Sequence, residues 1–142
     1  MRALGVDLGS KRIGIAVSDP TGTIASPLTV VHRSKSPRRD LDEIARIARE
    51  EEADLIVVGL PLTMRGEVGS AAEAAIVEAA RLATVVGVPV ETHDERLTTV
   101  TAERSLMEAG MRGQERRRVV DKVAAAVMLQ SWLDARRARG ST

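Results

Sequence analysis

Residues 3–18 read Ala3-Leu-Gly-Val-Asp-Leu-Gly-Ser-Lys-Arg-Ile-Gly-Ile-Ala-Val-Ser18, and the fold class follows from their pattern. Large apolar residues alternate with small or polar residues over positions 3–8 and again over 12–18, which is typical of β-strands. The three residues 9–11 between the two runs leave room only for a tight turn. The stretch therefore predicts a β-hairpin at the start of the chain.

One face of this hairpin carries an isolated carboxylate. In each strand every second residue is Leu, Val or Ile, whereas Gly, Ala and Ser occupy most positions of the other face around Asp7. A buried, unpaired carboxylate is costly, so Asp7 needs a cation, a hydrogen-bond network or a substrate. An ion pair with Arg2 or Arg12 would balance the charge but would not explain the small neighbours. We therefore interpret Asp7 as a functional residue.

The remaining chain extends the hairpin into a larger sheet. A third strand should follow the turn at 20–22 and be irregular or lie at an edge because it contains Pro27. We then expect a helix that is capped by Ser36 and ends near Glu52, followed by a strand at 55–58. A second helix should run from the capping box Ser70-x-x-Glu73 to about residue 86, followed by a strand at 88–92. Two more helices are expected at 99–109 and 115–138. This order predicts an α/β protein with a mixed sheet, three antiparallel strands followed by parallel ones, with helices on both faces. It is the ribonuclease H topology, in a single domain over residues 1–142.

Composition narrows the classes of function. The chain has 142 residues, 44% of them hydrophobic, and no cysteine, which excludes disulfides, cysteine zinc sites and thiol nucleophiles. No apolar run approaches the roughly 20 residues that span a bilayer, and the N-terminus does not resemble a signal peptide, so we expect a cytoplasmic protein without a membrane partner. Trp132 is the one aromatic residue, so nucleobases cannot stack on aromatic platforms.

Charge is unevenly distributed along the chain. Residues 1–110 carry a net charge of −4, whereas residues 111–142 carry +5. This asymmetry indicates an anionic partner near the C-terminal third, although an arginine-rich tail that is simply solvated would give the same pattern.

Two further segments could bring acidic side chains to Asp7. Asp121 lies in an otherwise apolar helical stretch, and the small residues Ala124 and Ala125 would allow this part of the helix to lie close to a sheet. The alternative is that Asp121 only interacts favourably with the helix dipole, as an Asp early in a helix commonly does. Asp94 and Glu95 follow a strand and point to opposite faces, so only one of them can join Asp7, and the pattern does not decide which. Three carboxylates would form an oxygen-only site suited to Mg²⁺ or Mn²⁺, and such ions support hydrolysis of nucleic acids.

Basic residues flank these acids and are candidates for phosphate contacts. They are Lys11, Arg12, Arg96, Arg116, Arg117, Arg118 and Lys122. We expect residues 112–122 to form a mobile arm that becomes ordered on nucleic acid.

Four ordered segments, at 5–19, 57–62, 94–99 and 121–125, together resemble the YqgF family, also called RuvX, known as Holliday junction resolvases or pre-16S ribosomal RNA nucleases. The resemblance covers nearly the whole chain and implies a ribonuclease H-like fold similar to that of RuvC resolvases. It also implies that Asp7, Glu95 and Asp121 are the catalytic and metal-binding trio. Thr63 and Arg65 depart from the family pattern, which usually has Asn and Asp there.

The resemblance implies a metal-dependent nuclease that matures the 5′ end of pre-16S rRNA as a monomer or weak homodimer. The alternative is a resolvase of Holliday junctions, which are branched DNA. Gly5-x-Asp-x-Gly-Ser also resembles the phosphate-binding turn of actin-like ATPases and sugar kinases, but those enzymes need two such domains. A nucleic-acid-binding module without catalysis is a further alternative.

Overall fold

A computed structural model describes residues 1–62, 65–95 and 113–140, with side chains in the last range from residue 119 onward. Arg96, Thr63 and the helix expected at 99–109 lie outside these residues. In chain order the elements are β1 (Ala3–Leu8), β2 (Arg12–Ser18), β3 (Ala25–His32), α1 (Pro37–Glu50), β4 (Leu55–Leu60), α2 (Ser70–Val85), β5 (Val90–Asp94) and α4 (Gly113–Gly140).

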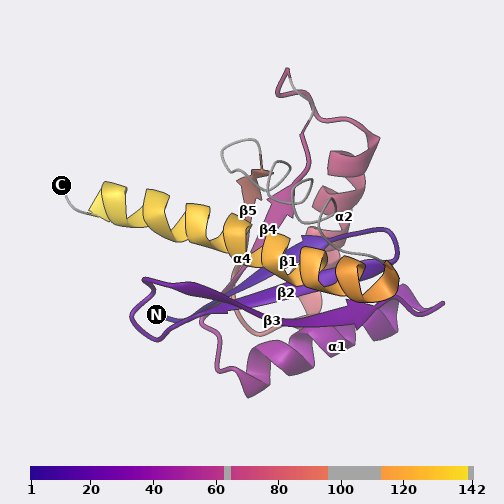
Figure 1. The fold of residues 1–142 in the computed structure, drawn as a ribbon, viewed down its shortest axis with the longest axis horizontal. Coiled ribbons are helices and arrows are strands. Elements are labelled where there is room, and N and C mark those ends of the chain that lie inside the picture. The colour runs from indigo at the N-terminus through magenta and orange to yellow at the C-terminus, as the bar shows by residue number, and fades with distance from the viewer. Residues whose placement is uncertain (63–64, 96–112, 141–142) are drawn as a thin grey trace.

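The five strands form one mixed sheet in the order β3-β2-β1-β4-β5 (Figure 1). β1 pairs antiparallel with β2, and β2 pairs antiparallel with β3. β4 is parallel to β1, and β5 is parallel to β4. The predicted α/β class and mixed sheet are therefore confirmed, and β1, which carries Asp7, is the central strand.

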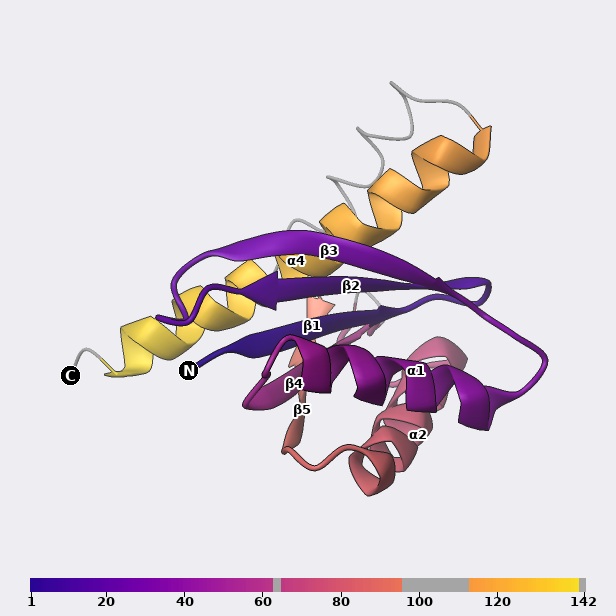
Figure 2. The ribbon, with the colours of Figure 1, turned by 90° about the horizontal axis from the view of Figure 1, so that it is seen from below.

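Helices cover both faces of the sheet, as Figure 2 shows with α1 and α2 on one side and α4 on the other. On the first side, Leu4, Val6 and Ile15 pack with apolar residues of α1 and α2. On the second side, Ala3 and Ala16 pack with α4, whose buried residues include Trp132. Because neighbouring residues of a strand point to opposite faces, this parity places Asp7 on the α4 side.

Several local predictions hold. Ser36 caps α1, and its Oγ accepts a hydrogen bond from the Arg39 amide at 3.2 Å. β3 lies at the edge of the sheet, and its register with β2 shifts opposite Pro27. Proline lacks the amide hydrogen that a ladder needs, which explains both the edge position and the shift.

Other boundaries differ from prediction. β4 continues through Gly59 to Leu60, because the strand stays paired with β5 there. β5 begins at Val90, two residues later than expected, and runs to Asp94. The capping box is wrong: Gly69 is the N-cap of α2, without a side-chain cap, and Ser70 is the first helical residue.

The structure describes part of the expected mobile arm, residues 113–122, and shows it as helix. α4 begins at Gly113, so residues 113–122, including the positions of Arg116, Arg117 and Arg118, belong to its first turns. Glu, Gln and Arg are good helix formers, and they extend the helix that the apolar middle anchors.

Candidate active site

Asp7 lies next to the last residue of β1, the central strand, and is 9% exposed. Its partner in the antiparallel register with β2 is Gly14. In the parallel ladder with β4, Val6 pairs with Val58, so Gly59 is the next residue beside Asp7. Glycines therefore lie on both sides of the carboxylate, on the face that α4 covers.

Gly14 allows the backbone of α4 to lie directly on the sheet beside Asp7. A Cβ atom at this position would lie 2.1 Å from the backbone oxygen of Asp121. Gly5 has a similar role further along the helix, where a Cβ atom would meet Leu129 Cβ at 2.8 Å. The small residues of the hairpin thus bring Asp121 close to Asp7.

Gly59 creates the corresponding space for Glu95. A Cβ atom there would lie 2.6 Å from Glu95 Oε1 and 3.1 Å from its Cγ, so the Glu95 side chain lies against β4 next to Asp7. Glu95 follows β5, which brings it to this end of the sheet.

Asp94 belongs to the other face of the sheet. His93 lies on the α4 side, because its Nε2 is 3.0 Å from Ser131 Oγ of that helix. Asp94, the next residue of the strand, therefore points toward the α1 and α2 side. Burial lowers the pKa of His93, which favours the neutral imidazole in this contact. Of the two acids that the sequence left open, Glu95 is the one that the structure brings toward Asp7.

Asp121 forms an ion pair with one of the predicted phosphate-binding residues. Arg12 Nε lies 2.6 Å from Asp121 Oδ2, and the two side chains are 21% and 19% exposed. Asp121 lies more than two turns into α4, beyond the first turn where a helix dipole would favour an acid. Its position is explained by Arg12 and by the sheet beneath it.

The other predicted basic residues divide into two groups. Lys11 is exposed at the hairpin turn, and Lys122 is partly exposed beside Asp121. Arg116, Arg117 and Arg118 belong to the N-terminal turns of α4. Of the predicted basic residues that the structure describes, Arg12 is the one that it shows in contact with an acid of the trio.

The chemistry of the three acids fits a divalent cation. All are carboxylates, the hard oxygen ligands that Mg²⁺ and Mn²⁺ prefer. Within the described ranges, no three acidic or histidine side chains lie close enough to hold a metal ion as they stand. Asp121 would have to exchange Arg12 for the ion.

Sequence reasoning recognised the small residues of the hairpin but missed Gly59. The sequence could have indicated the role of Gly59, because this glycine directly follows the apolar run 55–58. It points to the same face of the sheet as Val57, which packs under α4. Sequence reasoning also missed Arg33, which binds Gly9 O at 2.7 Å and has no motif around it.

The mixed sheet with helices on both faces is a fold of the ribonuclease H-like class, and Asp7 lies on its central strand. The chain belongs to the RuvX family: the family model, described as Holliday junction resolvase, matches residues 1–135.

Named relatives agree with this assignment. A protein of Mycobacterium sp. (strain KMS), named "Putative pre-16S rRNA nuclease", is 50% identical over 138 residues, covering 96% of this chain and 82% of its own. A Clostridium novyi protein of the same name is 44% identical, covering 95% of this chain and 99% of its own. The structure of Thermus thermophilus RuvC in complex with a Holliday junction substrate is similar with a TM-score of 0.59 at 18% identity, over 96% of both chains. At that identity the likeness concerns the fold.

In the part of the chain that the structure describes, no helix combines the length and apolar character needed to span a membrane.

Proposed function

We propose that residues 1–142 form a single metal-dependent nuclease domain that hydrolyses phosphodiester bonds in the 5′ region of pre-16S rRNA. Two contacts beside Asp7 support the proposal: the Glu95 side chain lies against Gly59, and the Asp121 backbone lies against Gly14, which pairs with Asp7. In this proposal the trio is catalytic and holds Mg²⁺ or Mn²⁺, and the enzyme works in the cytoplasm as a monomer or weak homodimer.

A bound divalent ion would activate a water molecule and stabilise the leaving oxygen. The chain itself supplies orientation. Asp7 is fixed by the central strand, Glu95 by its contact with Gly59, and Asp121 by the α4 backbone on Gly14. Elements that are rigid and packed hold ligands more accurately than loops do.

Arg12 and Lys11 bind and orient the phosphate backbone in this proposal. Arg12 is already at the site, 2.6 Å from Asp121, so an approaching phosphate would compete with that carboxylate for the guanidinium. In this proposal Arg96, Lys122 and the arginines 116–118 add further phosphate contacts. Such contacts fix position without reading sequence.

Similarity favours RNA as the substrate. The relatives named for pre-16S rRNA are 44–50% identical, whereas RuvC is 18% identical and shares the fold. The alternative is a Holliday junction resolvase, which the description of the family model favours. Cutting a junction symmetrically requires two active sites and therefore a two-fold dimer.

The substrate is tested by comparing a labelled 16S precursor fragment with a four-way DNA junction at matched salt, since phosphate contacts make affinity steeply salt-dependent. We expect a monomer that cleaves the RNA with Mn²⁺ and stops in EDTA. A dimer that makes paired nicks in the junction without cleaving RNA would support the resolvase instead. No cleavage of either substrate with Mn²⁺ would indicate a binding module without catalysis.

The assignment of the second acid has a matched pair of variants. Glu95→Gln and Asp94→Asn each remove one charge from neighbouring residues on opposite faces of the sheet. We expect the Glu95 variant to lose cleavage and the Asp94 variant to keep most of it. The reverse result would overturn the assignment of Glu95.

A further inference from the structure

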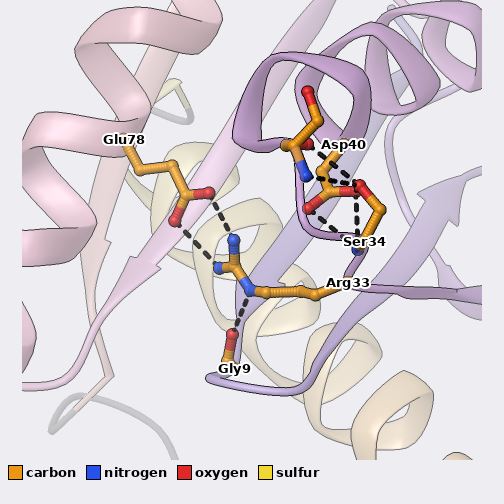
Figure 3. A network of polar contacts seen from close by, with 6 residues as sticks. Gly9, Arg33, Ser34, Asp40 and Glu78 are labelled. Carbon is orange, nitrogen blue, oxygen red and sulfur yellow. Dashed lines mark hydrogen bonds and ion pairs between the residues drawn. The ribbon is translucent and has the colours of Figure 1, made fainter.

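A polar network behind the hairpin turn connects this turn to helix α2 (Figure 3). Arg33 comes directly after β3 and lies beside the turn, because His32 pairs with Arg12 at the end of the β2–β3 ladder. Its side chain is 21% exposed and reaches from Gly9 on one side to Glu78 of α2 on the other.

Arg33 holds the turn at two points. Its Nε donates to Gly9 O at 2.7 Å, and its backbone amide donates to Lys11 O at 3.0 Å. Within the turn, the Gly9 amide donates to Arg12 O at 3.0 Å. The backbone on each side of Ser10 is therefore fixed from outside the hairpin by a single residue.

Arg33 is itself held firmly. Its two terminal nitrogens donate to the two carboxylate oxygens of Glu78 at 2.6 and 2.9 Å, a bidentate pair. The next residue is anchored as well, because the Ser34 amide and hydroxyl donate to Asp40, which is 4% exposed, at 3.0 and 2.7 Å. These contacts fix both the backbone and the guanidinium of Arg33.

Stability alone explains this arrangement poorly. Partly buried ion pairs lose much of their attraction to desolvation and are often no better than apolar packing. What the pair does achieve is orientation, since Glu78 occupies two arms of the guanidinium and leaves Nε directed at Gly9.

We propose that Arg33, oriented by Glu78, is a positioning residue that preorganises the 9–11 turn so that Lys11 and Arg12 meet a phosphate backbone beside Asp7. This inference rests on the proposed nuclease function. A turn that is already ordered loses less conformational entropy when nucleic acid binds. Arg33 therefore strengthens binding without contacting the nucleic acid.

The test measures RNA binding by fluorescence anisotropy in Ca²⁺, which avoids dependence on cleavage, together with hydrogen exchange of the turn. Arg33→Gln should weaken binding about three- to tenfold and speed exchange in peptides covering residues 8–12. With a metal ion that supports cleavage by the wild type, the KM of Arg33→Gln should rise by the same factor, with kcat nearly unchanged. Arg46→Gln is the matched control, because Arg46 pairs with Glu43 and Glu50 on the exposed side of α1, and it should change none of these quantities.

Glu78→Gln separates positioning from direct contact. If Arg33 positions the turn, Glu78→Gln weakens binding relative to Glu73→Gln, which removes the same charge from an exposed site on α2. If Arg33 were a phosphate ligand, freeing it from Glu78 would strengthen binding, and the proposal would be wrong.

Two other results would also overturn the proposal. One is a loss of unfolding free energy in Arg33→Gln with unchanged affinity and unchanged exchange in the turn, which would make the network purely structural. If Arg33→Gln does not fold, Arg33→Lys and Glu78→Gln are measured in its place. The proposal is then wrong if both variants bind RNA with the affinity of the wild type. A wild-type protein that binds RNA without cleaving it would contradict the nuclease function and leave this test intact.

Discussion

Replacing Gly14 by alanine should separate α4 from the sheet. The added Cβ would lie 2.1 Å from the backbone oxygen of Asp121 and 2.6 Å from its carbonyl carbon, far inside the 3.4 Å where ordinary contact begins. Both atoms belong to the helix backbone and cannot rotate away, so the whole helix must shift. Overpacking a core generally costs about 1–3 kcal/mol, and we expect Gly14→Ala to cost at least about 3 kcal/mol.

Urea denaturation followed by circular dichroism measures this loss. The shift would also disturb Trp132 and Leu133, which are buried between α4 and the sheet, so tryptophan fluorescence should change in the folded variant. Gly87→Ala is the matched control, because its Cβ would meet nothing within 4 Å, and it should stay within about 0.5 kcal/mol of the wild type. A Gly14→Ala variant as stable as the control would refute the close approach of α4 at this point.

Two further predictions concern a side chain that can move and a carboxylate that titrates. Gly59→Ala should leave the unfolding free energy within about 1 kcal/mol of the wild type, because the end of the Glu95 side chain can move. Cleavage should nevertheless fall sharply, because Glu95 is displaced. Cleavage equal to that of the wild type would contradict a role of Glu95 in catalysis. The pKa of Asp19 lies well below its usual value because the Ile24 amide donates to it, as does the Thr21 hydroxyl. Its contribution to stability is therefore present above the unfolded pKa of about 3.9 and is lost as the pH falls below it. Denaturation at pH 2.5 to 6 should show a smaller acid loss for Asp19→Asn, and an identical pH profile would contradict this reading.

The sequence predicted those parts of the fold that depend on local pattern. Alternation defined β1 and β2, and Ser36 with Pro37 defined the start of α1. Boundaries that depend on neighbouring strands were less accurate, as with the late start of β5.

The site could be predicted only in part, because its acids come from three distant segments. Asp7 was visible from its small neighbours, which lie within a single hairpin. The choice between Asp94 and Glu95 required the family resemblance. Strand parity shows that the two side chains point to opposite faces of the sheet, but not which of them shares the face of Asp7. The Arg12–Asp121 pair and the contact of Arg33 with Glu78 join residues far apart in sequence, and no local pattern marks such pairs.

Asp7→Asn removes the carboxylate on which the proposed hydrolysis depends. The side chain keeps its shape but loses the charge that would hold a divalent ion beside the phosphodiester. Cleavage of the 16S precursor fragment with Mn²⁺ should vanish, while the unfolding free energy of the variant should equal or exceed that of the wild type, since a buried carboxylate is removed. An Asp7→Asn protein that unfolds, or that cleaves at the wild-type rate, would contradict the catalytic role of Asp7.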